Sequence, residues 1–169
     1  MSAEPPKQQK LLLLTGIPGT GKTESGHVLV EHHGFAHLDA ELHAMSKPVS
    51  SREEWEGLWN DFLRRVEHLK ARGRDVVITW GFMPGVDDGT IRRLQEMGFT
   101  MVWFDGDRAA ARREFLKRGT VPENLLNLQM SRIDSLDLEA FRPQPFNPFD
   151  EKGQFLPHKM IAEQLIDLS

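Results

Sequence analysis

One eight-residue segment constrains this chain more than any other feature. It runs from Gly16 to Thr23, reads Gly-Ile-Pro-Gly-Thr-Gly-Lys-Thr, and matches G-x-x-x-x-G-K-[ST] at every fixed position. An apolar run at 10–14 precedes it, and a segment with helix-compatible spacing at 24–33 follows it. The glycines let the backbone curl so that several N–H groups point at one anion, beside the positive end of the helix. The segment therefore predicts a phosphate-binding loop between a buried strand and a helix.

The rest of the chain alternates strand-like and helix-like segments, which indicates an α/β sheet. Ser51 and Glu54 form a capping box at the start of the clearest helix, and Gly73 follows its end. Strands are expected at 10–14, 35–39, 75–79 and 99–104, with a fifth near 144–149. Helices are expected at 24–33, 51–72, 87–97, 108–118, 121–133 and 159–168. We therefore expect a single three-layer α/β domain, with a parallel sheet of about five strands, helices on both faces, and residues 1–9 as a flexible tail.

The composition excludes several classes of protein. The 169 residues include no cysteine, which excludes disulfides, thiolate zinc sites and a cysteine nucleophile. The richest apolar run, 11–14, is too short to span a bilayer, and residues 1–10 lack a signal-peptide pattern, so we expect a cytoplasmic protein. The net charge of −4 argues against a nucleic-acid partner, because phosphate backbones are bound by clustered Lys and Arg.

The phosphate-binding loop, the small size and a basic helix at 108–118 resemble the small P-loop kinases. This nucleoside monophosphate kinase-like group of P-loop NTPases includes shikimate, gluconate and polynucleotide-type kinases. The resemblance implies the three-layer P-loop NTPase fold, with ATP and Mg²⁺ as cofactors. In the loop it implies that Lys22 reaches the β- and γ-phosphates and that the Thr23 hydroxyl coordinates Mg²⁺. It assigns the remaining phosphate contacts to Gly16, Pro18, Gly19, Thr20 and Gly21.

The resemblance also assigns an acceptor side. In these kinases an acidic residue after the second strand faces the acceptor hydroxyl or helps to hold Mg²⁺, and Asp39 occupies that position. A carboxylate there would deprotonate a hydroxyl for in-line attack on the γ-phosphorus, with Glu41 as an assistant. The alternative is that Asp39 caps a helical turn. Trp80 and Phe82, after the third strand, either line an acceptor pocket or cover the edge of the sheet.

A cluster of cations follows the fourth strand. Five of them fall within eleven residues: Arg108, Arg112, Arg113, Lys117 and Arg118. The cluster resembles the lid of small kinases, here spanning about 106–133, in which arginines stabilise charge on the transferring phosphoryl group. The resemblance assigns Arg112 to the nucleotide base and Arg118 to the phosphates, while a solvated basic face is the alternative. Asp105, which ends the fourth strand, is a candidate for holding Mg²⁺ through water.

Together these features predict an ATP- and Mg²⁺-dependent kinase that phosphorylates a hydroxyl of a small metabolite, as a monomer or homodimer. The short segment 44–50 favours a small acceptor, and Arg52, Arg64 and Arg65 are either contacts for anionic substrate groups or part of a solvated face. Two alternatives stay open. One is a nucleotide or polynucleotide 5′-hydroxyl kinase, with Trp80 as the base-stacking aromatic. The other is an NTP-binding regulatory ATPase with little phosphotransfer.

Overall fold

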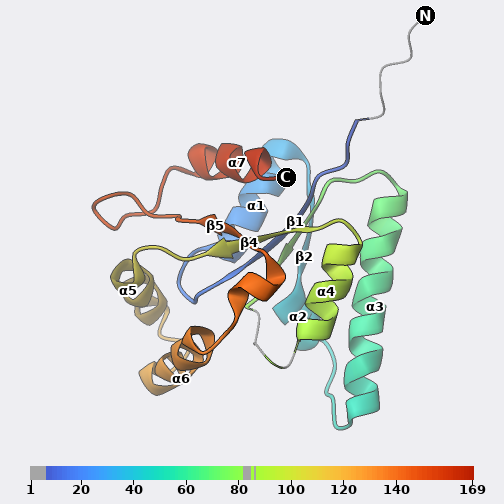
Figure 1. Cartoon of the computed structure of the whole chain (residues 1–169), viewed down its shortest axis with the longest axis horizontal. Coiled ribbons are helices and arrows are strands. Elements are labelled where there is room, and N and C mark those ends of the chain that lie inside the picture. Colours follow the sequence, from blue (N-terminus) through green and yellow to red (C-terminus); the bar gives the residue numbers. More distant parts are fainter. Residues whose placement is uncertain (1–6, 82–84, 86) are drawn as a thin grey trace, which may run out of the picture.

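Five parallel strands form the centre of the protein, in the order β2-β3-β1-β4-β5 (Figure 1). The computed structural model describes residues 7–81, 85 and 87–169. The strands are β1 (Leu11–Gly16), β2 (Ala36–Asp39), β3 (Val76–Thr79), β4 (Thr100–Phe104) and β5 (Gln144–Phe146). This sheet confirms the predicted fold class, including the fifth strand, which is three residues long and lies at the edge beside β4.

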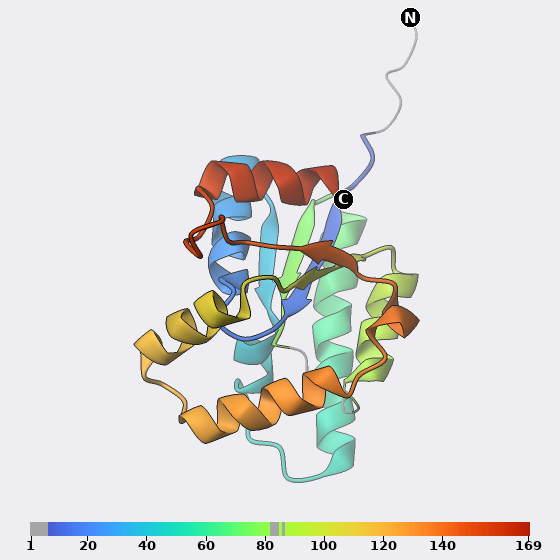
Figure 2. The same ribbon diagram turned by 60° about the vertical axis from the view of Figure 1, so that its left-hand side comes forward.

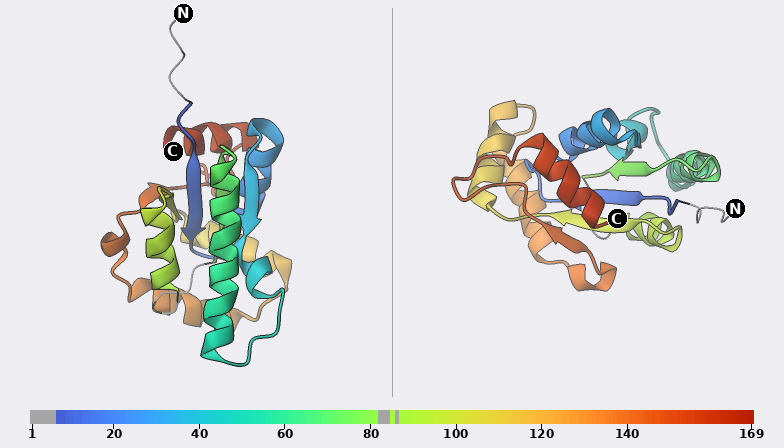
Figure 3. Two further views of the ribbon diagram at one scale, coloured as in Figure 1. Left: turned by 90° about the vertical axis from the view of Figure 1, so that its right-hand side faces the viewer. Right: turned by 90° about the horizontal axis from the view of Figure 1, so that it is seen from above.

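Helices cover both faces of the sheet and its carboxyl edge (Figures 2 and 3). The described helices are α1 (Lys22–His33), α2 (Ala40–Ala44), α3 (Arg52–Ala71), α4 (Asp88–Glu96), α5 (Arg108–Arg118), α6 (Glu123–Asp134) and α7 (His158–Asp167). A short 3₁₀ helix at Leu138–Phe141 was not expected from the sequence. Helices α3 and α4 lie on one face and α1 and α7 on the other, whereas α2, α5 and α6 gather where the strands end. None of the helices in the described ranges is long and apolar enough to cross a membrane.

The four consecutive leucines of β1 divide between two hydrophobic cores. Side chains alternate between the faces of a strand, so Leu11 and Leu13 belong to the core beneath α3 and α4, and Leu12 and Leu14 to the core beneath α1 and α7. All four are buried, which is why the run contains no polar residue. Strand β1 is therefore fixed from both sides and ends at a defined place, where the phosphate-binding loop begins.

The longest helix, α3, begins at the predicted N-cap. Ser51 Oγ accepts a hydrogen bond from Glu54 N (3.1 Å), and Glu54 Oε2 accepts one from Ser50 N (2.7 Å) rather than from Ser51. In a standard capping box the Glu54 carboxylate would accept from Ser51 N, so here this second bond is displaced by one residue. Two main-chain N–H groups are still satisfied. The inward face of α3 buries Trp59, Phe62 and further apolar residues against the sheet.

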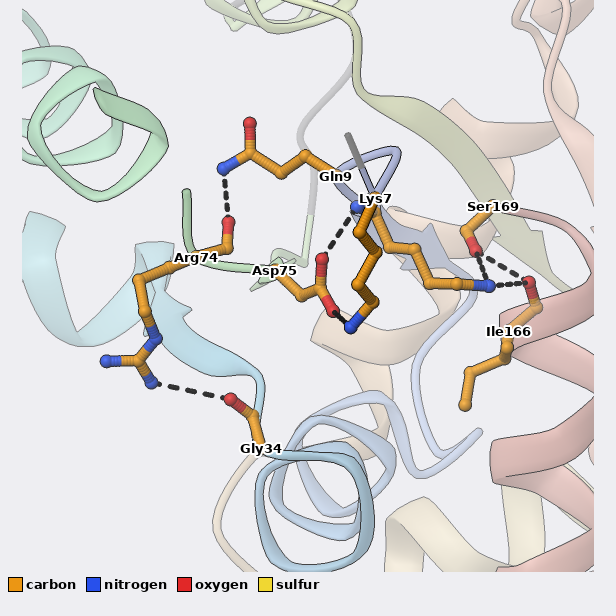
Figure 4. Close-up of polar contacts among 8 residues, drawn as sticks. Lys7, Gln9, Gly34, Arg74, Asp75, Ile166 and Ser169 are labelled. Carbon is orange, nitrogen blue, oxygen red and sulfur yellow. Dashed lines mark hydrogen bonds and ion pairs between the residues drawn. The ribbon is translucent and has the colours of Figure 1, made fainter. Parts of the chain in front are cut away.

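The start of β1 is tied to neighbouring elements (Figure 4). Lys10 N donates to Asp75 Oδ1 (2.8 Å), and Lys7 Nζ lies 3.4 Å from Asp75 Oδ2. Gln9 Nε2 donates to the main-chain carbonyls of Lys70 in α3 and of Arg74 beyond its end, and Lys10 Nζ donates to the Ser169 hydroxyl (3.2 Å). Lys7 and Gln9, in the expected tail, are therefore bonded to the end of α3 and to the segment between α3 and β3, while residues 1–6 lie outside the described part of the chain.

We expect Phe62→Ala to lower the free energy of unfolding by about 3–5 kcal/mol, because Phe62 is fully buried between α3 and the sheet. Urea denaturation would measure the loss. The matched control is Glu67→Ala on the exposed face of the same helix, with an expected change of about 0.5 kcal/mol or less. Equal losses from the two variants would contradict the burial of this face.

Candidate phosphate-binding and acceptor site

The loop between β1 and α1 is built on glycines that have no room for a side chain. Gly16, Gly19 and Gly21 have φ values of 132°, 79° and 73°. A Cβ on Gly16 would lie 2.2 Å from the carbonyl oxygen of Phe104 in β4, and a Cβ on Gly19 would lie 2.0 Å from that of Ala111 in α5. Gly16 and Gly19 are therefore required for two reasons. Their backbone has positive φ, and a neighbouring main chain leaves no room for a Cβ at either position.

A cavity of about 220 Å³ opens beside this loop, at the carboxyl ends of the strands. Such an edge is where ligands bind in open α/β sheets. The cavity is lined by Pro18, Gly19, Thr20, Gly21, Lys22, Thr23, Asp39, Glu41, Thr79, Trp80, Gly81, Phe115, Arg118, Val121 and Gln129. Six consecutive loop residues thus share one cavity with the predicted acceptor carboxylate and with one arginine of the basic helix.

The Lys22 ammonium group folds back over the loop. Its Nζ donates to the carbonyl oxygens of Ile17 (2.7 Å) and Gly16 (3.3 Å). Burial lowers the pKa of Lys22 from its ordinary value of 10.5 to about 8, with the nearby Glu41 carboxylate raising it and the Arg118 guanidinium lowering it. A phosphate in the cavity would stabilise the ammonium form, so ligand binding and protonation of Lys22 are coupled.

Asp39 serves as the helix cap that the sequence offered as an alternative, and it also faces the cavity. Its Oδ1 accepts hydrogen bonds from the main-chain N–H of Glu41 (2.9 Å) and Leu42 (3.0 Å) at the start of α2. Both bonds use Oδ1, and among the described residues none is bonded to Oδ2, which can accept a hydrogen bond from a ligand. The cap fixes the carboxylate in the same cavity as Lys22 and Thr23, and the two interpretations are compatible.

The cavity suits Mg²⁺ held together with a nucleotide. Within the described residues, no three acidic or histidine side chains gather into a ready-made metal site. Mg²⁺ commonly binds through one or two protein oxygens, substrate phosphates and water, and the Thr23 hydroxyl and Asp39 Oδ2 provide oxygens of this kind. Both residues thus remain our candidates for holding the ion.

The basic helix α5 places only one of its five cations in the cavity. Arg118 lines it, whereas the others bond to protein groups. Arg112 donates to Asn127 Oδ1 (2.8 Å) and forms an ion pair with Glu123, and so joins α5 to α6. The remaining three pair with Asp105 and Asp134 (Arg108), the carbonyl of Gly153 (Arg113) and Glu114 (Lys117).

A second hollow of about 280 Å³ adjoins the loop on its other side. Its wall includes Gly21, Arg118, Phe155 and His158, and the Phe155 ring remains 38% exposed. A planar base fits between a guanidinium group and an aromatic ring, since both stack on π-systems. Arg118 lines this hollow and Arg112 does not, so Arg118 is a further candidate for the base-side arginine. Sequence reasoning missed Phe155, whose only signal was an aromatic residue after the turn at Gly153.

Asp105 lies outside the cavity. It accepts hydrogen bonds from Arg108 Nη2 (2.9 Å) and from Gly106 N (2.8 Å). Burial by itself would raise the pKa of Asp105, but the bonds from Arg108 and Gly106 outweigh it and hold the pKa below its usual range. The carboxylate is therefore committed to Arg108, and its proposed role in holding Mg²⁺ gains no support from the geometry.

Trp80 takes part in both the core and the cavity. It is 4% exposed, and its ring stacks on Trp59 with centroids 4.4 Å apart. Phe82 lies outside the described residues. Arg52 and Arg64 form ion pairs with acidic neighbours on α3 and do not line the cavity, which favours the solvated-face interpretation for both.

Comparisons with known proteins agree with this geometry. No family model matches the chain. A shikimate kinase from Persephonella marina is 26% identical over 99 residues, a match that spans 56% of this chain and 60% of that protein. The fold is shared with a gluconokinase from Sinorhizobium meliloti (TM-score 0.63, 16% identity, 95% and 93% of the two chains covered). It is also shared with a sugar kinase from Janibacter (0.62, 16%, 95% and 94%) and a shikimate kinase from Acinetobacter baumannii in complex with shikimate (0.60, 16%, 96% and 93%). The protein therefore has the fold of the small P-loop kinases.

Gly19→Ala should disturb the loop far more than Gly34→Ala. Both glycines have positive φ, but a Cβ on Gly34 meets nothing within 4 Å, whereas one on Gly19 meets the α5 backbone. We expect Gly34→Ala to lower stability by about 1–2 kcal/mol without affecting ligands. Gly19→Ala should in addition weaken ATP binding by about tenfold or more, a loss of about 1.4 kcal/mol at least. Calorimetric titration would measure the affinities, and equal affinities would contradict the steric argument.

ATP binding should take up protons near pH 8, because the pKa of Lys22 is about 8 before the phosphates arrive and rises when they do. Titrations at pH 8 in buffers of different ionisation enthalpy would measure the uptake. The same titrations with Lys22→Met measure the protons that ATP itself exchanges on binding. Subtracting that number from the wild-type number leaves the proton uptake by Lys22. We expect a difference of about half a proton at pH 8 and almost none at pH 6.5, with affinity falling as the pH rises above 8. The same difference at both pH values would contradict the assignment.

Proposed function

We propose that this protein is an ATP- and Mg²⁺-dependent kinase that transfers the γ-phosphoryl group to a hydroxyl of a small metabolite. One observation carries the proposal: the phosphate-binding loop, Lys22, Arg118 and the carboxylate of Asp39 line a single cavity of about 220 Å³. A nucleotide binder without a second substrate needs no carboxylate there. The similarity to shikimate, gluconate and sugar kinases supports the same reaction class.

The nucleotide would lie along the loop. Its base would occupy the hollow between Arg118 and Phe155, and its β- and γ-phosphates would bond to the loop amides and to Lys22. Arg118 lines both spaces, and in this proposal it contacts both the phosphates and the base. When bound by Thr23 and the phosphates, Mg²⁺ would supply positive charge that offsets the negative charge of the transferring group.

The acceptor would approach from the side of β2 and β3. Its hydroxyl oxygen forms a bond to the γ-phosphorus while the bond from that phosphorus to the β–γ bridging oxygen breaks, giving ADP and a phosphate ester. The hydroxyl proton passes to Asp39 Oδ2, whose partner oxygen is held by the cap of α2. Lys22 and Arg118 stabilise charge on the transferring oxygens.

The size of the cavity and the position of Trp80 favour a small acceptor over a polynucleotide end. A nucleic-acid end kinase would use an aromatic side chain to stack the terminal base, and the Trp80 ring already stacks on Trp59. The first test is ATP consumption by the pure protein with Mg²⁺, screened against pools of hydroxyl metabolites, nucleosides and 5′-hydroxyl oligonucleotides. Consumption above background with one metabolite pool would support the proposal, and tight ATP binding with no pool active would overturn it.

Asp39→Asn should lower kcat by about 10²- to 10⁴-fold, because an amide cannot accept the hydroxyl proton. The amide oxygen still caps α2, so thermal stability should stay nearly unchanged. ATP affinity should change little, since the phosphates are held by the loop and Lys22. Steady-state kinetics and a thermal melt would measure these quantities, and phosphotransfer at the wild-type rate would show that Asp39 is not the base.

A further inference from the structure

The segment between β5 and α7 forms a hairpin over residues 148–156. Asp150 N donates to the carbonyl oxygen of Gln154 across the hairpin (2.8 Å). Asp150 Oδ1 also accepts hydrogen bonds from the main-chain N–H groups of Lys152 (2.8 Å) and Gln154 (2.9 Å), which fixes the turn. The hairpin is therefore a compact unit whose position depends on what it packs against.

The hairpin carries one wall of the hollow that we assign to the nucleotide base. The Phe155 ring stacks on the buried Phe149, with ring centroids 4.7 Å apart and an interplanar angle of 27°. It also lies against the phosphate-binding loop, because a Cβ on Gly21 would be 3.2 Å from its Cε1 atom. Arg118 lines the same hollow from the end of α5. The separation of Phe155 from Arg118 therefore decides how well a planar base fits between them.

The tip of the hairpin packs on α5, the same helix that ends with Arg118. A Cβ on Gly153 would lie 2.9 Å from Asp107 Oδ2 and 3.3 Å from the Ala110 side chain, so only glycine permits this approach. Arg113 Nη2 donates a hydrogen bond to the Gly153 carbonyl oxygen (2.6 Å). Asp107, Ala110 and Arg113 are three residues apart in sequence and so lie on one side of the helix. This side of α5 holds the hairpin.

Arg113 is thus connected to the base hollow without facing it. It lines neither that hollow nor the loop cavity. Its partner, Gly153, precedes Phe155 by two residues on the arm of the hairpin that returns to α7. A change in the bond between Arg113 and Gly153 would therefore move the ring of Phe155 relative to the loop.

We propose that Arg113 is a positioning residue for the nucleotide base. Its hydrogen bond to Gly153 holds the hairpin on α5, and so sets the separation of Phe155 from Arg118. The inference rests on the nucleotide site of the proposed function, but it concerns binding alone and needs no acceptor. Helix α5 then contributes to base binding in two ways, directly through Arg118 and indirectly through Arg113.

The test compares ATP with tripolyphosphate, which carries three linked phosphates but no base. Calorimetric titration of the whole protein with Mg²⁺ gives the ratio of the two affinities. Phe155→Ala should lower ATP affinity by about 10- to 100-fold, the range of base–aromatic stacking, and leave tripolyphosphate binding unchanged. Arg113→Met keeps the length of the side chain but not its donors, and should lower the ratio by about fivefold or more. Arg113→Lys should lower the ratio less, because an ammonium group keeps a donor for the carbonyl.

Further variants show whether Arg113 acts through the ring. Arg113→Met combined with Phe155→Ala should bind ATP no more weakly than Phe155→Ala alone, because a residue that acts through the ring has no effect once the ring is gone. Gly153→Ala would place a Cβ against the start of α5, and should lower the ratio as Arg113→Met does. Lys117→Met is the matched control. It removes a cation of the same helix that pairs with Glu114, and its ratio should equal that of the wild type.

Equal losses of ATP and tripolyphosphate affinity in Arg113→Met would overturn the inference, since the residue would then act on the phosphates or on the fold as a whole. Additive losses in the double variant would also overturn it, because Arg113 would then act by a route other than Phe155. Neither outcome affects the proposed phosphotransfer, which the acceptor screen tests. An acceptor screen without turnover would overturn the kinase function, and the measured ATP affinities would still decide the role of Arg113. Absence of ATP binding by the wild type would overturn both.

Discussion

The phosphate-binding loop is positioned by main-chain contacts that exclude every side chain at two of its glycines. Gly16 lies against the backbone of Phe104 in β4, and Gly19 against that of Ala111 in α5. These contacts hold the loop between the central sheet and the basic helix, so the direction of its N–H groups is set by the packing of both. The cavity, the position of Lys22 and the approach of Arg118 all depend on this arrangement.

The cations of the basic helix α5 have different roles. Most of its cations bond to other protein groups: Arg108 bridges Asp105 and Asp134 outside the lid region, whereas Arg112 joins α5 to α6 within it. Arg118, at the last turn of the helix, lines the loop cavity. Of the two arginines that the resemblance assigned to the nucleotide, Arg112 is therefore bonded to other protein groups and Arg118 lines the cavity.

The fold was predictable because its signals are local. The apolar run of β1, the capping residues of α3 and the glycines that end α1 and α5 each act within a few residues of their own position. Individual site residues were predictable only where a sequence motif or the family resemblance pointed to them. Lys22, Thr23 and Asp39 line one cavity. Arg112 and Asp105 do not line it, and they form ion pairs with Glu123 and Arg108. Phe155 was missed, since nothing near it in sequence shows that its ring lies over Gly21.

By itself, the sequence determined that this chain forms a parallel α/β sheet with a phosphate-binding loop, because periodicity and the spacing of glycines act through the backbone alone. It also determined that Asp39 stands at the end of a strand. Only the tertiary structure decided which charged side chains face the cavity. That choice depends on partners far away in sequence, such as Asp134 for Arg108 and Gly81 for Glu41, which compete for or make room for each group.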